Sequence, residues 1–362
     1  MRATLRIDNK MMQGTGLAYP ASIPASIKGW DAISSLANMP PDHAVQLDNF
    51  IPRPGFLEIR RGSELFCDTG EASPVETIMA YNAPVSGNTA LFAVANGTIG
   101  NITAGGTAAS TGITGLANSR LQHVNFTNSS LTSYLVAVNG TNTPLIYDGS
   151  AWANMSLTGF TANDAIHVNA WKGRLWFVIN NSTQVAYLPV GAIAGTASTF
   201  DLGPFMSMGG YVNAIGTWTI DTQQQVDEYI AFITSKGQVI VYQGTDPSTA
   251  NTFALVGIYN LGTPIGRRCY LRISGNLWII TMDGVIPMTE MLQIDRASAP
   301  RVALTSMIMN AINSATQNYA LNWGWQFISY PRGTLAILNI PTAENSTALQ
   351  YVMNTITGAW CR

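Results

Sequence analysis

Six segments of this sequence repeat one pattern: an apolar run of strand length, a turn rich in Gly or Asn, and a second apolar run. They occupy residues 90–103, 133–152, 173–189, 228–244, 275–289 and 333–360. The first apolar positions, Leu91, Leu135, Leu175, Ile230, Leu277 and Leu335, are 44, 40, 55, 47 and 58 residues apart. This spacing is close to the roughly 40–50 residues of a four-stranded propeller blade. The sequence therefore predicts an all-β propeller of about six to eight blades.

A β-sandwich is the alternative all-β fold. A sandwich shows turn signals every ~8–12 residues, but it does not repeat a hairpin at this longer period. The run at 55–67 is expected to supply a further blade or the strand that closes the ring, because the last hairpin has no obvious fourth strand of its own.

Two of the predicted turns contain Asn-Gly, at Asn96-Gly97 and Asn139-Gly140. A two-residue hairpin loop needs positive φ angles, which Asn and Gly adopt more readily than other residues. Lys236-Gly237 and Asp283-Gly284 occupy equivalent places. These dipeptides predict tight hairpins within the blades.

Three regions flank or interrupt the predicted hairpins. Residues 1–28 are polar and unperiodic, which is typical of an extended arm. Residues 29–66 are predicted to lead into the first blade, and residues 67–362 to form the propeller. Within the propeller, residues 301–320 place apolar side chains near helical spacing, which predicts a short helical insertion packed on the blades.

The charge content is low. The chain has 18 Lys+Arg and 20 Asp+Glu, a net charge of −2, and only 10% charged residues. Such a balance excludes a nucleic-acid binder of the basic-patch type. Between Thr77 and Tyr147 the single charged residue is Arg120. Either this surface is buried against other subunits, or it is a Thr/Ser/Asn-rich β surface; the scarcity of Lys favours the first explanation.

No apolar stretch approaches the ~18 residues of a membrane span, and the first residues contain no apolar signal-peptide core. We therefore expect a soluble protein made without export. Three cysteines, Cys67, Cys269 and Cys361, are distant in sequence and odd in number. They are predicted to be buried thiols that pack as small apolar groups.

The sequence contains no pattern of catalytic or metal-binding residues, and we predict no catalytic site, metal or cofactor. His167 lies between two apolar residues and is interpreted as a core or rim imidazole. Asp227-Glu228 is the one adjacent acidic pair in a strand, where neighbours point to opposite faces. The tryptophans in strand-like runs are predicted to pack in the blade core: Trp171, Trp176, Trp278, Trp323 and Trp325.

One basic cluster stands out in this charge-poor chain. Arg267, Arg268 and Arg272 lie close together and are candidates for contact with DNA or an acidic partner. Three arginines also form an ordinary solvated or interfacial patch, and we prefer that interpretation.

Residues 29–66 resemble the N-terminal signature of the tail tubular or nozzle proteins of short-tailed bacteriophages. The matching residues are Trp30, Met39, Ala44, Leu47, Asn49, Phe50, Pro52, Arg53, Gly55, Arg60 and Gly62. The last segment, YVMNTITGAWCR at 351–362, is similar to a late strand of the same family. The resemblance brackets nearly the whole chain, while the middle is matched by architecture only.

The resemblance implies a structural virion protein of the phage tail, assembled in the host cytoplasm. Such proteins form hexamers below a portal-adaptor ring, carry tail fibres or spikes, and let double-stranded DNA pass through without specific binding. Six residues are expected near a subunit interface: Trp30, Asn49, Pro52, Arg53, Gly55 and Arg60.

Two other functions stay open. A propeller that binds or cleaves glycans would bring three or more carboxylates to one end of the axis, yet Asp148 and Asp164 are the only acids between Glu76 and Asp201. A head–tail connector that contacts DNA would line a channel with Arg267, Arg268 and Arg272.

Overall fold

The computed structural model describes residues 22–362 apart from 86, 223–224, 250, 274 and 293–295. Most of the predicted N-terminal arm, residues 1–21, therefore lies outside the described residues. No described helix is long and apolar enough to cross a membrane.

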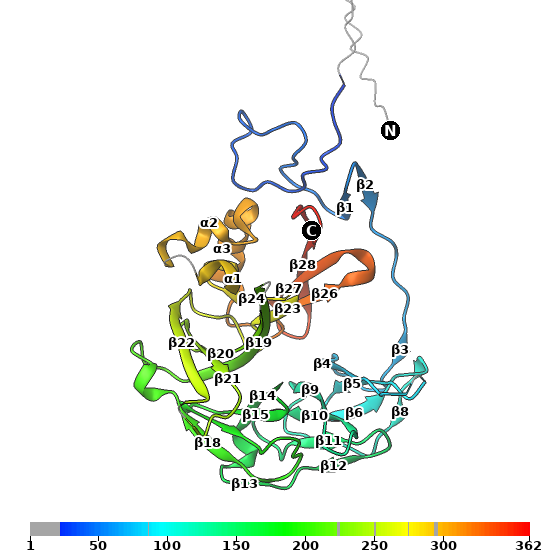
Figure 1. Ribbon diagram of the computed structural model, residues 1–362. Coiled ribbons are helices and arrows are strands. Elements are labelled where there is room, and N and C mark those ends of the chain that lie inside the picture. The colour runs from blue at the N-terminus through cyan, green and yellow to red at the C-terminus, as the bar shows by residue number, and fades with distance from the viewer. Residues whose placement is uncertain (1–21, 86, 223–224, 250, 274, 293–295) are drawn as a thin grey trace, which may run out of the picture.

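Six antiparallel sheets follow one another around a central axis and form a six-bladed propeller (Figure 1). Blade 1 comprises β4 (Thr77–Tyr81), β5 (Ala90–Ala95), β6 (Thr98–Asn101) and β8 (Ala109–Ser110). Blade 2 comprises β9 (Gln122–Thr127), β10 (Ser133–Val138), β11 (Leu145–Tyr147) and β12 (Trp152–Asn154). Blade 3 comprises β14 (Ala165–Trp171), β15 (Arg174–Ile179), β16 (Gln184–Tyr187) and β18 (Ser198–Asp201). Blade 4 comprises β19 (Val212–Thr222), β20 (Gln225–Thr234), β21 (Gln238–Gly244) and β22 (Phe253–Asn260). Blade 5 comprises β23 (Tyr270–Ile273), β24 (Asn276–Thr281) and β25 (Gly284–Pro287). Blade 6 comprises β26 (Gln326–Tyr330), β27 (Leu335–Ala343), β28 (Thr347–Asn354) and β29 (Trp360–Cys361).

The predicted propeller is confirmed, and each of the six repeated hairpins forms the second and third strands of one blade. The first strand of every blade lies nearest the axis (Figure 1). Two short parallel pairs join the outer parts of the ring: β3 (Cys67–Asp68) with β7 (Gly106–Thr107), and β13 (Leu157–Thr158) with β17 (Gly195–Thr196).

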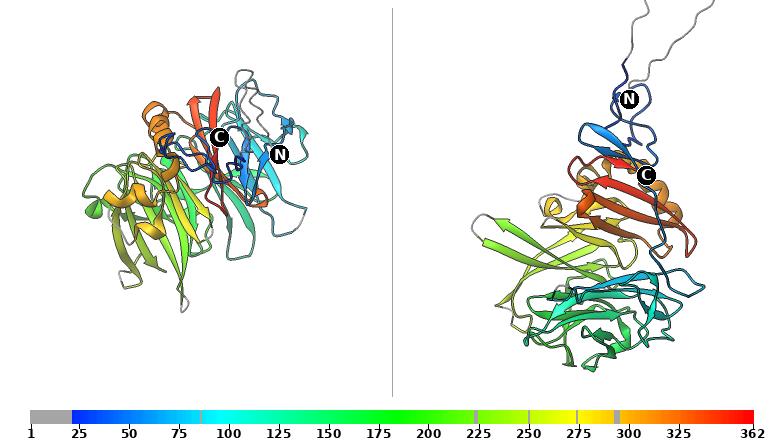
Figure 2. Two further views of the ribbon diagram at one scale, coloured as in Figure 1. Left: turned by 90° about the horizontal axis from the view of Figure 1, so that it is seen from above. Right: turned by 90° about the vertical axis from the view of Figure 1, so that its right-hand side faces the viewer.

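The predicted further blade or closing strand at 55–67 is wrong. Residues of this run form β2 (Phe56–Ile59), which pairs with β1 (Phe50–Arg53) in a separate hairpin, and then β3 at the edge of blade 1. The fourth strand of blade 6 is β29, from the C-terminal end of the chain itself. The β1–β2 hairpin lies beside blade 6, and both views of Figure 2 place the C-terminus close to it.

The turns follow the sequence prediction in part. Asn96 and Gly97 have φ angles of 50° and 70° and connect β5 to β6 as a tight hairpin. Asn139-Gly140 does not form a tight hairpin, because residues 139–144 make a longer loop between β10 and β11. There the Asn139 side chain accepts hydrogen bonds from the backbone N–H groups of Thr141 and Asn142 and holds the loop open.

Blade 5 has three strands, and the helical insertion follows them with α1 (Met288–Met291), α2 (Ala299–Val302) and α3 (Met309–Tyr319). The helix predicted over 301–320 is confirmed in part: its first two residues end α2, and Met309–Tyr319 form α3. Thr305 interrupts the earlier part, since its buried hydroxyl accepts a hydrogen bond from the backbone N–H of Val285. Ile312 and Ala315 of α3 pack in the core between blades 5 and 6, as expected for an insertion lying on the blades.

Five buried apolar clusters hold the ring together, one at each junction from blades 1–2 to blades 5–6. Among the described residues, no such cluster joins blade 6 to blade 1. Cys269 and Cys361 are buried as predicted, and burial raises the pKa of both thiols to about 12. Cys67 is half-buried instead, because β3 is a two-residue strand at the rim.

Candidate functional site

A depression of about 750 Å³ lies at one end of the propeller axis. It is lined by turns between second and third strands, including residues 96–97, 139–141 and 180, and by connections between blades, including residues 116–120 and 266–267. Loops from several blades thus converge on one concave surface, which is the usual place for a binding site on such a scaffold.

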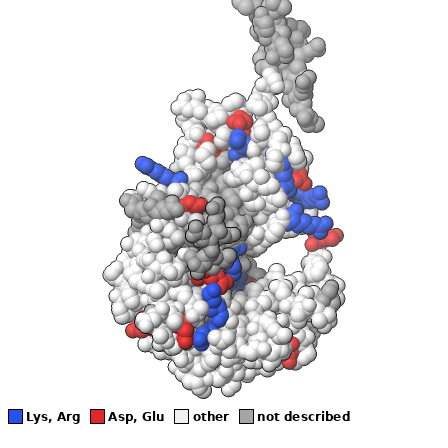
Figure 3. Space-filling model, in the orientation of Figure 1, with Lys and Arg blue, Asp and Glu red and all other residues white. Residues whose placement is uncertain are grey.

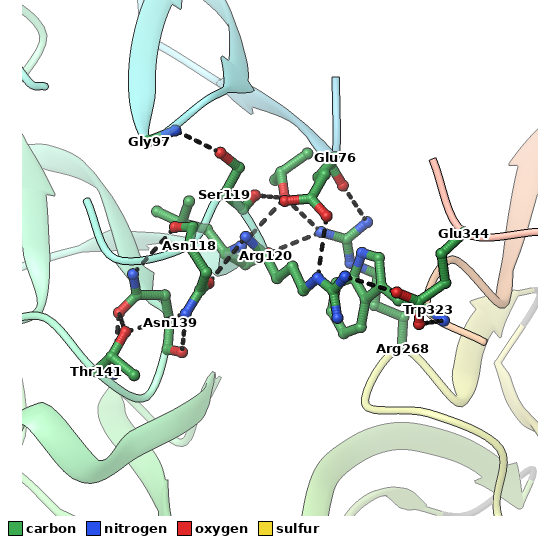
Figure 4. A network of polar contacts seen from close by, with 12 residues as sticks. Glu76, Gly97, Asn118, Ser119, Arg120, Asn139, Thr141, Arg268, Trp323 and Glu344 are labelled. Atoms are coloured by element: carbon green, nitrogen blue, oxygen red, sulfur yellow. Dashed lines mark hydrogen bonds and ion pairs between the residues drawn. The ribbon is translucent and has the colours of Figure 1, made fainter. Parts of the chain in front are cut away.

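Uncharged polar groups form one wall of this depression (Figure 4). The Asn118 side-chain amide donates to the Thr141 hydroxyl at 3.0 Å, and the Asn139 amide donates to the Asn118 carbonyl oxygen at 3.3 Å. Ser119 accepts from the backbone N–H of Gly97 at 2.8 Å through its hydroxyl oxygen. These bonds connect blades 1 and 2, so the wall is preformed.

A second wall contains a charged network centred on Arg120 (Figure 4). Arg120 forms ion pairs with Glu76, before blade 1, at 3.0 Å and with Glu344, in the turn between β27 and β28, at 3.1 Å. Burial acts against the charged guanidinium, but the hydrogen bonds to the two carboxylates outweigh it and raise the pKa of Arg120. Glu344 also accepts from the backbone N–H of Trp323, which lowers the pKa of this carboxyl.

The Trp323 ring has two guanidinium groups near it. The Arg120 and Arg268 guanidinium carbons are 5.0 and 5.1 Å from its ring centroid, within the range of cation–π attraction. The prediction that Trp323 packs in the blade core is therefore wrong: the ring is half-buried and lines the depression. Trp171, Trp176 and Trp325 are buried in the blades as predicted, and Trp278 packs partly buried at the edge of a core cluster.

Arg268 connects the last blades to the first. Its guanidinium donates to the Thr77 hydroxyl at 2.6 Å, to the Leu121 carbonyl at 3.0 Å and to the Glu76 carbonyl at 3.1 Å. It also donates to the Gln326 side chain of blade 6 at 3.3 Å. Burial lowers the pKa of Arg268 to about 10, so the group stays charged at neutral pH.

We call the junction between blades 6 and 1 the seam. It holds a cleft of about 670 Å³, lined by Ile78 of β4, Ile328 of β26 and His123 of β9, among others. Figure 3 shows a hollow on this side of the molecule. Ile78 and Ile328 are exposed, at 58% and 40%. Among the described residues, the ring is closed here by the Arg120 network and Arg268, not by an apolar core.

The structure separates the three arginines predicted to act together. Arg267 lines the depression, whereas Arg268 directs its donors to groups of the chain itself. Arg272 lies on β23, which begins after the other two arginines; it is exposed and donates to the Thr219 hydroxyl at 3.2 Å. The Arg120 network was not predicted; its sequence signal was the isolation of Arg120 in a charge-free stretch of about 70 residues.

Among the described residues, three or more carboxylates do not meet at this end of the axis; Glu76 and Glu344 are the two that approach each other, at Arg120. Glu76 is the one carboxylate among the residues that line the depression, and it is paired with Arg120. Glu228 of the Asp227-Glu228 pair forms an ion pair with Lys172 at 2.9 Å, on another part of the ring. The described residues contain no group of three His, Cys, Asp or Glu that could hold a metal ion.

The six residues expected at an interface gather beside blade 6. Trp30 is buried, and its backbone N–H donates to the backbone carbonyl oxygen of Trp360 at 2.7 Å. The remaining contacts fix the β1–β2 hairpin: Asn49 with Arg60 and Arg362, Pro52 with Asn354, Arg53 with Glu58 and Thr334, and Gly55 at the hairpin turn with φ 85°. These contacts lie within one chain.

Neither a known protein family nor a curated protein matches this sequence. Solved structures similar to the chain include BBS1N in complex with ARL6DN, at TM-score 0.47 and 12% identity over 79% of this chain and 81% of that one. Another is the extracellular domain of a putative hybrid two-component system from B. thetaiotaomicron, at TM-score 0.41 and 13% identity over 76% and 33%. A third is a putative 6-phosphogluconolactonase from Bacteroides uniformis, at TM-score 0.38 and 13% identity over 66% and 71%.

Proposed function

We propose that this chain is a structural subunit of the tail nozzle of a short-tailed bacteriophage. In this proposal six copies form a ring below the portal adaptor, carry fibres or spikes outside, and conduct the genome during ejection. The chain contributes shape and contact surfaces and catalyses no reaction.

The observation that carries the proposal is the meeting of the two segments that resemble the nozzle family. Residues 29–66 and 351–362 lie at opposite ends of the sequence, yet they form one unit on blade 6. Backbone hydrogen bonds connect Trp30 to Trp360 and Asn49 to Arg362, and Arg362 pairs with Asp48. A resemblance confined to two distant segments is more specific when both build the same part of the molecule.

This unit also presents an apolar surface. Six large hydrophobic side chains within residues 29–59, the part of the segment that lies beside blade 6, are exposed: Ile33, Leu36, Val45, Phe50, Phe56 and Ile59. Exposed apolar groups that gather in one region of a soluble protein favour a protein–protein interface. The segment therefore supports assembly of the ring through the surface that the family resemblance marks.

The charges agree with a conduit that does not retain DNA. Each phosphate neutralised by Lys or Arg adds salt-dependent affinity, so a chain with net charge −2 gains little from a duplex. Of the three arginines that are candidates for DNA contact, Arg268 and Arg272 donate to groups of the chain itself, and only Arg267 lines the axial depression. This arrangement favours the nozzle over a connector that grips DNA.

The arrangement of the carboxylates near the depression disfavours the glycoside hydrolase alternative. Hydrolysis of a glycosidic bond uses two carboxyl groups within ~5–10 Å of each other. The network beside the depression contains two carboxylates, Glu76 and Glu344, and both are held in ion pairs with Arg120.

Native mass spectrometry of the purified protein tests the proposal. We expect a sixfold ring, and we expect Ile59→Asp to dissociate it because a buried, unpaired carboxylate opposes assembly. Val190→Asp is the matched control, since Val190 is 59% exposed, Ile59 is 69% exposed, and Val190 lies outside the lead-in segment. A monodisperse monomer at all concentrations, or equal loss of the ring in both variants, would overturn the proposal.

A further inference from the structure

Arg267 reaches across the axial depression. It belongs to the connection between β22 and β23, on the side of blade 5. A Cβ atom added at Gly140, in the β10–β11 loop of blade 2, would lie 3.3 Å from Arg267 Nη1. The guanidinium therefore lies against the opposite side of the ring and forms part of the surface of the depression.

The Arg267 side chain has no hydrogen bond or ion pair to any described residue, in contrast to Arg120 and Arg268. The network beside the depression holds two carboxylates, Glu76 and Glu344, and two guanidinium groups, Arg120 and Arg268, so its charges balance without Arg267. One positive charge is left without a partner. Burial lowers the pKa of Arg267, which reflects the cost of holding this charge away from water.

Partly desolvated charges in proteins are normally paired, so an anion that enters here gains a favourable contact. A guanidinium binds a carboxylate through two parallel N–H···O bonds. One free guanidinium matches one negative charge, whereas a polyphosphate needs several cations and would meet the Glu76 carboxylate in the wall.

The remaining lining favours a ligand with hydroxyl groups. Asn180 and Asn345 line the depression, and their side-chain amides make no hydrogen bond to described residues, so donors and acceptors remain available. The volume, about 750 Å³, lies within the usual range of small-molecule sites.

We propose that the axial depression binds a small acidic carbohydrate, with its carboxylate on Arg267 and its hydroxyl groups on the uncharged loops. This function is separate from ring assembly, which uses the lead-in segment on blade 6. Failure of one proposal therefore leaves the other unchanged.

Titration with sodium glucuronate, glucose and sodium acetate at constant ionic strength, followed by NMR or calorimetry, tests this site. We expect saturable binding of glucuronate, and binding about tenfold weaker or more for glucose, which lacks the charge, and for acetate, which lacks the hydroxyl groups. We expect Arg267→Gln to weaken glucuronate binding at least about tenfold. Arg272→Gln is the control and should bind as the wild type does, because Arg272 does not line the depression.

Asn180→Asp provides a second variant that leaves Arg267 in place and adds a repelling charge to the depression. It should weaken glucuronate binding while acting little on glucose. Three results would overturn the proposal: no saturable binding of glucuronate to the wild type, equal binding by folded Arg267→Gln, or acetate binding as tightly as glucuronate.

Discussion

Arg120 and Glu344 form an ion pair of 3.1 Å, although 224 positions separate them in the sequence. Arg120 stands before blade 2 and Glu344 in blade 6, so this contact spans the seam. The other five junctions of the ring are filled by buried apolar side chains. The propeller is thus a ring with five apolar joints and one joint made of charges, an aromatic ring and hydrogen bonds.

Glu344→Gln should loosen the seam. The pair is partly exposed, with side chains 33% and 41% accessible, so we expect a loss of only about 0.5–1 kcal/mol in the free energy of unfolding at low salt, and less at high salt. The local effect should be larger than the global one, because no cluster of described apolar residues supports this junction. Hydrogen exchange of β4 and β26 should become faster, which mass spectrometry of peptic fragments measures.

Glu228→Gln is the matched control for this variant. Its partner Lys172 and Glu228 have similar exposure, 33% and 35%, but the junctions on that side of the ring have apolar cores. Exchange in β4 and β26 should not change in this variant. Equal acceleration in both variants, or none in Glu344→Gln, would show that the seam does not depend on the ion pair.

The β5–β6 hairpin gives a test of backbone geometry. Gly97 has a φ angle of 70°, and a Cβ atom there would lie 2.4 Å from the Leu116 carbonyl oxygen. Gly97→Ala should therefore cost about 2–4 kcal/mol of unfolding free energy, from left-handed strain and overpacking together. Gly112→Ala should cost about 1–2 kcal/mol, since Gly112 has a similar φ of 77° but open space around its Cβ position. Urea unfolding measures both, and equal losses would contradict the role of the Leu116 contact.

The sequence predicted the blades because their determinants are local. Each signal can be recognised within a stretch of about 50 residues: the alternation of apolar residues, the Asn96-Gly97 turn and the spacing of the hairpins. The predicted turns and helix differ from the structure where a single side chain forms hydrogen bonds that change the local backbone. Asn139 holds a longer loop than its Asn-Gly dipeptide suggested, and Thr305 delays the start of α3.

The candidate site was predictable only in part. The sequence analysis assigned one role to Arg267 and Arg268 because they are neighbours in the sequence. In the structure, Arg268 donates hydrogen bonds within the chain, whereas Arg267 lines the depression without a hydrogen-bond partner among the described residues. Glu76, Arg120, Trp323 and Glu344 come together from four places in the chain. Such long-range contacts depend on ring closure, and the sequence marked only Arg120, through its isolation in a stretch otherwise free of charge.

His167 is an imidazole held in its neutral form. It lies on β14 beside the axis, is 3% exposed, and has one ring nitrogen 3.3 Å from the Tyr270 hydroxyl. Burial lowers the pKa of His167 to about 3, and the nearby positive charge of Arg267 acts in the same direction. This agrees with the interpretation of His167 as a core or rim residue of the ring.

The pKa of His167 makes stability dependent on pH. In the unfolded chain the imidazole takes up a proton near its ordinary pKa of 6.5, whereas the folded protein resists protonation down to about pH 3. Between these values the unfolded state binds more protons, so a falling pH favours unfolding by up to ~1.4 kcal/mol per pH unit. His167→Gln should reduce this slope in urea unfolding between pH 7 and pH 5, because glutamine does not titrate. Ile166→Val, a neighbouring buried substitution, should lower stability equally at both pH values; a slope that is the same in His167→Gln and the wild type would rule out His167 as its source.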